Sequence, residues 1–80
     1  MTIMTHLPNA KFAVCVWNEG YEASLERNKI YAVVEDRAAL ADGDLRIIDE
    51  SGEDYLYPAA WFIAIDVPDR VQESVLRATA

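Results

Sequence analysis

The sequence predicts a mainly β domain: a small, strongly bent barrel of five short strands followed by a short C-terminal helix. Five runs rich in β-branched and aromatic residues alternate with turn residues, and the end of the chain carries apolar residues at helical spacing. A chain of 80 residues is long enough for one domain only. Closing five short strands into a barrel removes the exposed edges that a flat sheet would leave, which favours the barrel.

The first two strands are expected at residues 11–17 and 29–35. Both alternating faces of the first run are apolar. One face carries Phe12, Val14 and Val16, and the other carries Ala13, Cys15 and Trp17. A strand with two dry faces needs a layer of cover on each side. The segment between the strands, residues 21–28, fits either a two-stranded excursion or an irregular loop.

The next elements are a helical turn over 37–41, stopped by the Asp42-Gly43-Asp44 sequence, and a third strand over 45–49. A hairpin turn follows at 50–53, where Gly52 can adopt positive φ.

The fourth strand is expected at residues 54–57 and ends at Pro58, which has no amide proton for the ladder. A single 3₁₀ turn over 58–60 then leads into a fifth strand over 61–65. Alternation places Tyr55 and Tyr57 on one face and Leu56 on the other. The sequence leaves open whether these tyrosines and the tryptophan at 61 are exposed or form part of the core.

The C-terminal helix is expected over 68–79, with Asp66 as its N-cap. Val71 and Val75 recur at helical spacing, so this helix is the expected second cover for the first strand. Residues 1–9 are interpreted as a flexible N-terminal arm, and residues 10–80 as one barrel domain that includes the helix.

The charge is unevenly distributed. Fourteen acidic residues outnumber seven Lys and Arg for a net charge of −7, and residues 35–54 hold eight of the acids against two arginines. Such a surface repels nucleic acid and anionic lipid, and it favours a basic protein partner. No apolar run approaches the roughly 20 residues that span a bilayer. Cys15 is the only cysteine, so we expect a reducing, cytoplasmic location. There is no Gly-rich phosphate loop, and we expect no cofactor.

The run Tyr57-Pro58-Ala59-Ala60-Trp61-Phe62 and the order of the elements resemble an SH3 domain. The resemblance implies an SH3-like barrel in which Tyr57 and Phe62 face the core. It also implies that Pro58 and Trp61 lie on a peptide-binding surface, and that an acidic excursion between the first two strands contacts basic ligand residues. The first strand lacks the alanine-leucine-tyrosine-aspartate-tyrosine signature of eukaryotic SH3 domains.

A second resemblance covers most of the chain. Residues 29–31 and 45–58, and above all the run Asp49-Glu50-Ser51-Gly52-Glu53-Asp54-Tyr55-Leu56-Tyr57-Pro58, are similar to a family of small bacterial proteins of unknown function. This resemblance implies family membership and carries no activity with it.

These observations predict a non-enzymatic interaction module that docks a basic or proline-containing segment of a protein partner. Exposed aromatic side chains are typical interface residues, and acids on a rim speed the encounter with a basic partner. The predicted binding residues are Trp61, Pro58, Tyr55 and Tyr21, rimmed by Glu19, Glu22, Asp36 and Asp44.

Two alternatives stay open at this point. The chain could form a structural homodimer through its first strand and its C-terminal helix. A weaker alternative is a metal site on the acidic turn at 49–54, which does not have EF-hand spacing. We do not expect an enzyme, because the only histidine, His6, lies in the N-terminal arm and no nucleophile-elbow motif is present.

Overall fold

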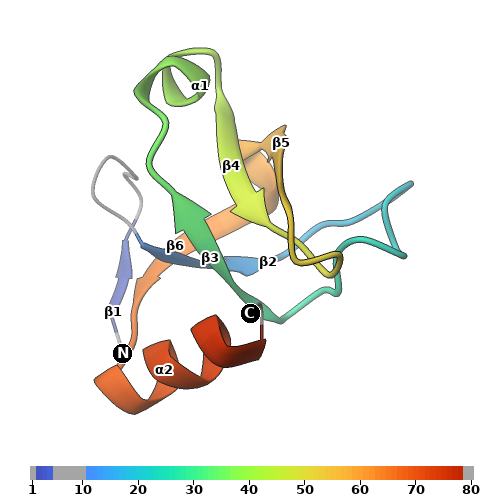
Figure 1. Cartoon of the computed structure of the whole chain (residues 1–80). Coiled ribbons are helices and arrows are strands. Elements are labelled where there is room, and N and C mark those ends of the chain that lie inside the picture. Colours follow the sequence, from blue (N-terminus) through green and yellow to red (C-terminus); the bar gives the residue numbers. More distant parts are fainter. Residues whose placement is uncertain (1, 5–10, 79–80) are drawn as a thin grey trace.

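A computed structural model describes residues 2–4 and 11–78, which form a six-stranded antiparallel sheet and a C-terminal helix (Figure 1). The elements are β1 (Thr2–Met4), β2 (Phe12–Cys15), β3 (Ile30–Val34), α1 (Arg37–Ala41), β4 (Asp44–Ile48), β5 (Asp54–Pro58), η1 (Ala59–Trp61), β6 (Phe62–Asp66) and α2 (Asp69–Ala78). All five predicted strands are confirmed as β2 to β6, as are the helical turn α1, the 3₁₀ turn η1 and the C-terminal helix α2. Strand β1 falls within the segment interpreted as an arm.

The strands lie in the order β1-β6-β2-β3-β4-β5. Strand β2 is central: Ala13 lies opposite Ala64 of β6 on one side and opposite Tyr31 of β3 on the other. Strands β1 and β5 stand at the two ends of the sheet, and within residues 2–4 and 11–78 no pairing joins them. The sheet is therefore open, and the closed barrel that the sequence predicts is not confirmed.

The sheet bends around an inner core, which lies on one face of β2 and extends across to β4 and β5. Its buried members are Ala13, Cys15, Leu25, Tyr31, Leu45, Ile47, Tyr57 and Phe62. Tyr57 and Phe62 are both buried here, as the SH3 resemblance implies. The bend lets one sheet cover much of its own inner face, and Leu40 of α1 and Ala59 and Trp61 of η1 pack against the same core.

Helix α2 covers the opposite face of the sheet and packs across β3 (Figure 1). Its half-buried Val71 and Val75 contact an outer core made of Phe12, Ala32, Ile65 and Val67. The first strand is thus covered on both faces, by the inner core and by α2. This confirms the two layers of cover that its doubly apolar pattern predicts.

Helix α2 begins at Asp69, and the carbonyl of Pro68 accepts the first bonds from the amides of Val71 (2.9 Å) and Gln72 (3.0 Å). Asp66 is instead the last residue of β6, so its predicted role as N-cap is wrong. Strand β1 explains the difference, because its pairing with β6 reaches Asp66 and holds that residue in extended conformation.

Strand β2 has no open edge, since β3 and β6 pair with it on either side. A homodimer through that strand would first have to break these pairs. Neither helix in the described ranges is long and apolar enough to cross a membrane.

Candidate functional site

The segment between β2 and β3 (residues 16–29) folds over one end of the inner core as a series of turns. The Asn18 side chain donates to the Leu25 carbonyl (2.8 Å), and the amides of Ser24 and Leu25 both donate to the Tyr21 carbonyl (2.9 Å each). Leu25 is fully buried and fixes the loop to the core. Of the two interpretations of 21–28, the irregular loop is confirmed, and its shape brings Tyr21 toward β5 and η1.

Three aromatic rings meet where this loop crosses β5 and η1, and we call Tyr21, Tyr57 and Trp61 the aromatic surface. The ring centroid of Tyr21 lies 5.6 Å from that of Tyr57 and 5.5 Å from that of Trp61, both in edge-to-face geometry. Tyr57 is buried, Trp61 is half-buried, and Tyr21 is 50% exposed. Rings in these orientations stabilise one another, so they hold a preformed apolar surface open to solvent.

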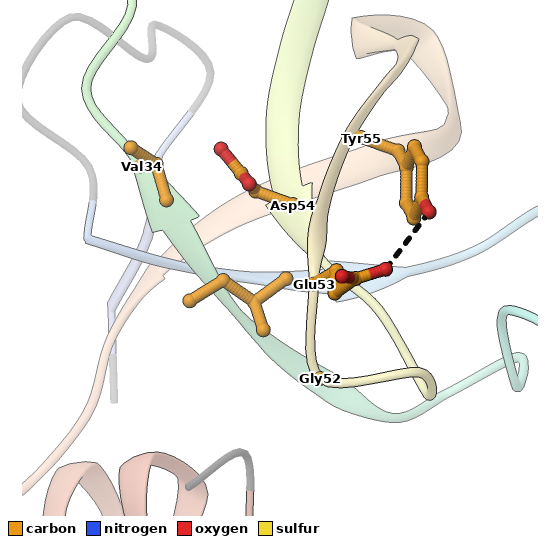
Figure 2. Close-up of a pocket in the computed structure, with 6 residues that line it drawn as sticks. Val34, Gly52, Glu53, Asp54 and Tyr55 are labelled. Carbon is orange, nitrogen blue, oxygen red and sulfur yellow. Dashed lines mark hydrogen bonds between the residues drawn. The ribbon is translucent and has the colours of Figure 1, made fainter.

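Two shallow pockets lie on the two sides of the β5 hairpin. The inner pocket, of about 470 Å³, adjoins the aromatic surface; its lining residues are Tyr21, Ser24, Asp49, Ser51, Tyr55, Leu56 and Tyr57. The outer pocket, of about 550 Å³, is lined by Val34, Ile48, Gly52, Glu53, Asp54 and Tyr55. Figure 2 shows the outer pocket, with Tyr55 and Asp54 on opposite sides of the β5 ribbon.

Asp49 is the buried polar residue at the start of the hairpin turn, with 3% of its surface exposed. Its carboxylate accepts from the Ser51 amide (2.9 Å), the Ser51 hydroxyl (2.5 Å) and the Tyr57 hydroxyl (2.6 Å). Burial raises the pKa of Asp49, but these donors outweigh it and hold the pKa below its ordinary value. Burial and the adjacent carboxylate also raise the pKa of Tyr57 to about 12.

Glu50 ties the same hairpin to the 16–29 loop. Its carboxylate accepts from the Lys29 ammonium (2.7 Å) and from the Tyr31 hydroxyl, and both donors lower its pKa. The Tyr31 oxygen in turn accepts from the Glu26 amide (2.8 Å). The Glu50 amide also donates to the Ser24 carbonyl (2.9 Å). These contacts fix the loop against the hairpin and so fix the position of Tyr21.

The structure brings together most of the predicted aromatic binding residues. Tyr21 packs on Trp61, and Tyr55, 49% exposed, lines the inner pocket with Tyr21. Pro58 is exposed and ends β5, where it lies opposite Asp44.

The predicted acidic rim is dispersed. Glu19 and Glu22 are exposed on the loop that carries the aromatic surface. Asp36 has a structural role: it caps α1 by accepting from the Ala39 amide (2.9 Å) and accepts from the Arg46 guanidinium (2.9 Å). The Ala39 amide and then Arg46 lower the pKa of this carboxyl. Asp36 is therefore engaged within the chain rather than directed at a partner.

The sequence analysis misses Leu25, and it considers Asp49 only as part of a metal-binding turn and not as the acceptor that anchors the hairpin. The signal for Asp49 is the sequence Asp49-Glu50-Ser51-Gly52, since an aspartate commonly bonds backbone two residues on in a turn. Leu25 has no such signal, because a single leucine in a polar loop does not reveal whether the loop folds back onto the core.

The described residues were also considered as a metal site and as a source of a nucleophile. In the described part of the chain, no group of three or more His, Cys, Asp or Glu side chains is arranged to hold a metal ion. Cys15 is buried, donates to the Trp17 carbonyl (3.2 Å), and has its pKa raised by burial. A buried thiol with a raised pKa is a poor nucleophile. His6 lies outside the described residues.

Comparisons with protein-family models, with curated proteins and with solved structures gave no match to this chain.

Proposed function

We propose that this chain is a non-enzymatic, SH3-like interaction module that binds a basic or proline-containing segment of a protein partner on its aromatic surface. The observation that carries the proposal is the packing of Tyr21 against Tyr57 and Trp61, which leaves Tyr21 half exposed. Pro58, which follows Tyr57 in the chain, is also exposed. A rigid aromatic surface open to solvent costs little conformational entropy on binding. We place the module in the cytoplasm, because its single cysteine has no partner for an internal disulfide.

The order of the elements supports the SH3-like part of the proposal. A strand, a long loop, two further strands separated by α1, a tight hairpin, a strand, a 3₁₀ turn and a last strand follow one another. At the β5-η1 junction Tyr57 and Phe62 are buried and Pro58 is exposed, while Trp61 is half-buried against the inner core.

The charges near this surface support a basic partner. Glu19 and Glu22 are exposed on the loop that carries Tyr21. Carboxylates on the rim of an apolar surface attract a cationic segment and speed its association, and salt weakens this effect.

Titration with a synthetic peptide tests the proposal. The probe is a short peptide of alternating prolines and lysines, and its control has glutamate in place of every lysine. We expect saturable binding of the lysine peptide that weakens as salt is raised, and no binding of the glutamate peptide. Tyr21→Ala is expected to weaken binding about tenfold, because it removes the exposed part of the aromatic surface.

The matched control is Trp17→Ala, which removes another exposed aromatic ring outside the aromatic surface. This variant should bind like the parent protein. Equal affinities for the parent and Tyr21→Ala, or equal binding of both peptides, would show that the aromatic surface is not the binding site.

A further inference from the structure

Strand β5 presents an unpaired backbone edge, because it pairs with β4 on one side and is the last strand of the sheet on the other. The bonds that flank the ladder fix which groups point outward. The Ala59 amide donates to the Gly43 carbonyl (2.8 Å), and the Asp49 amide donates to the Glu53 carbonyl (3.1 Å). In an antiparallel pair the direction alternates, so the odd-numbered residues of β5 face β4 and the even-numbered ones face outward.

The outward groups are the amide and carbonyl of Asp54, the amide and carbonyl of Leu56, and the carbonyl of Pro58. Within the described residues, no backbone hydrogen bond reaches these groups. Pro58 has no amide proton, so it limits the open ladder to residues 54–58. Such an edge is a template for one additional strand.

The two pockets flank this edge and both extend around it: Tyr55 lines both pockets, and Leu56 lines the inner one. On the inner face, Tyr55 lies opposite Ile47 of β4, and Tyr57 lies opposite Leu45. Leu56 shares the outer face with Arg46. The side chains of an added strand would alternate between these two faces. One set would enter the aromatic inner pocket, and the other set would reach the outer pocket (Figure 2).

The two pockets differ in chemistry, and the difference identifies the occupant. The outer pocket has an apolar floor of Val34 and Ile48 beneath the exposed carboxylates of Glu53 and Asp54. Asp54 already meets Arg46, but at 3.4 Å and in solvent, where an ion pair contributes little. A lysine or arginine fits this pocket, with its aliphatic stem on the floor and its charge at the carboxylates. The inner pocket is lined by the rings of three tyrosines and by Leu56, and its one carboxylate, Asp49, is already bonded by Ser51 and Tyr57, so it fits an apolar side chain.

We propose that the open edge of β5 binds an extended segment of a protein partner as an additional strand, with alternating basic and apolar side chains. This inference rests on the proposed function in that the partner segment is again basic. It adds the mode of binding, which is backbone pairing at Asp54 and Leu56 rather than contact with the aromatic surface alone.

The test uses a synthetic peptide of alternating lysine and valine as its probe, with a block peptide of the same composition as its control. Binding is followed by NMR titration of the labelled protein. We expect the alternating peptide to bind and to slow hydrogen exchange of the Leu56 amide. Leu56→Pro removes the outward amide and should weaken binding at least about tenfold, whereas Leu56→Ala keeps the amide and should stay within about threefold.

Peptide backbone methylation gives a second test that leaves the protein unchanged, should Leu56→Pro fail to fold. Methylating the peptide amides that face β5 should abolish binding, and methylating the alternate amides should not. Equal binding of the two methylated peptides, equal binding of the block peptide, or no binding at all would overturn the inference. Protection of Leu56 that appears on raising protein concentration without peptide would also overturn it, in favour of pairing between two copies.

The outcomes separate this inference from the proposed function. If the proline–lysine peptide binds and Tyr21→Ala weakens it, while the alternating peptide does not bind, the aromatic surface stands and the strand addition fails. If Leu56→Pro removes binding of the alternating peptide, while Tyr21→Ala changes neither peptide's affinity, the strand addition stands and the aromatic surface fails.

Discussion

The two halves of the sheet differ in how completely they are covered. In the half formed by β6, β2 and β3, strand β2 has a partner on each side, and its faces are buried by the inner core and by α2. In the half formed by β4 and β5, strand β5 has one partner, and four of its five residues are exposed. The buried strands, including β4 with its core residues Leu45 and Ile47, supply stability, whereas β5 leaves most of its side chains and one backbone edge open to solvent.

The largest expected effect is loss of a buried side chain from the inner core. Ile47 is fully buried on β4 and shares a face with Tyr55 of β5. Ile47→Ala should reduce the free energy of unfolding by about 3–4 kcal/mol, because it leaves a cavity in packed surroundings. Chemical denaturation followed by circular dichroism measures the change.

Leu56→Ala is the control on the neighbouring strand, since the Leu56 side chain is 47% exposed. Its expected cost is within about 0.5 kcal/mol. Equal costs for Ile47→Ala and Leu56→Ala would mean that Leu56 is packed as tightly as the core, and would remove the contrast between the buried strands and the exposed β5.

Val75→Asp tests whether the packing of α2 on the sheet stabilises the fold. Ser74→Asp is the control, because it adds the same charge at an exposed position of the same helix. Val75 contacts the outer core, so a carboxylate there must either be buried or release the helix. We expect a loss of about 2 kcal/mol for Val75→Asp and about 0.5 kcal/mol or less for Ser74→Asp. Thermal denaturation of both variants measures this, and similar melting temperatures would show that α2 does not stabilise the sheet.

The hydrogen bond from Tyr57 to Asp49 ties β5 to the turn that precedes it. Tyr57→Phe removes one of the donors to a buried carboxylate and should cost about 1–2 kcal/mol. Tyr55→Phe is the matched control, because the Tyr55 hydroxyl bonds Glu53 (3.0 Å) in solvent. This control should change stability by only a few tenths of a kcal/mol. A larger loss for Tyr55→Phe than for Tyr57→Phe would contradict the account.

The smallest effect expected is a dependence of stability on pH. The pKa values of Asp49 and Glu50 are lower in the folded chain than their ordinary values, which are about 3.9 and 4.3. A lowered folded pKa gives stability that is present above the unfolded pKa and is lost as pH falls through the folded one. The denaturant concentration at the midpoint of unfolding should therefore decrease when the pH is lowered below about 4. In Glu50→Gln the midpoint should decrease less with acid than in the parent protein. An equal decrease in both would exclude Glu50 as a cause of the pH dependence.

Much of the fold was predictable because it follows from local patterns. Alternation in 11–17 predicts a strand with two buried faces, which is confirmed for Phe12–Cys15 but not for Trp17, which lies beyond the strand and is 46% exposed. Helical spacing of Val71 and Val75 predicts the cover of one face, and this is confirmed. The end of β6 was not predictable in this way. Asp66 has the chemistry of an N-cap, but its pairing with β1 decides its conformation. Whether the sheet closes also depends on how far its end strands lie from each other, which no local pattern encodes.

The candidate site was predictable only in part, for the same reason. The spacing of Pro58 and Trp61 places these residues at the end of β5 and in η1. The meeting of Tyr21 with Trp61 depends instead on the buried Leu25, which folds the loop onto the core. Asp36 belongs to the acidic stretch by sequence, yet its position before α1 makes it a cap. Charge alone does not distinguish these roles.

Residue-by-residue amide hydrogen exchange on the dilute protein, without peptide, tests the contrast between the halves most directly. Amides of β2 should exchange slowly, and along β5 protection should alternate: Tyr55 and Tyr57, whose amides face β4, slow, and Leu56, whose amide faces solvent, fast. A Leu56 amide as well protected as that of Tyr57 would contradict the open edge.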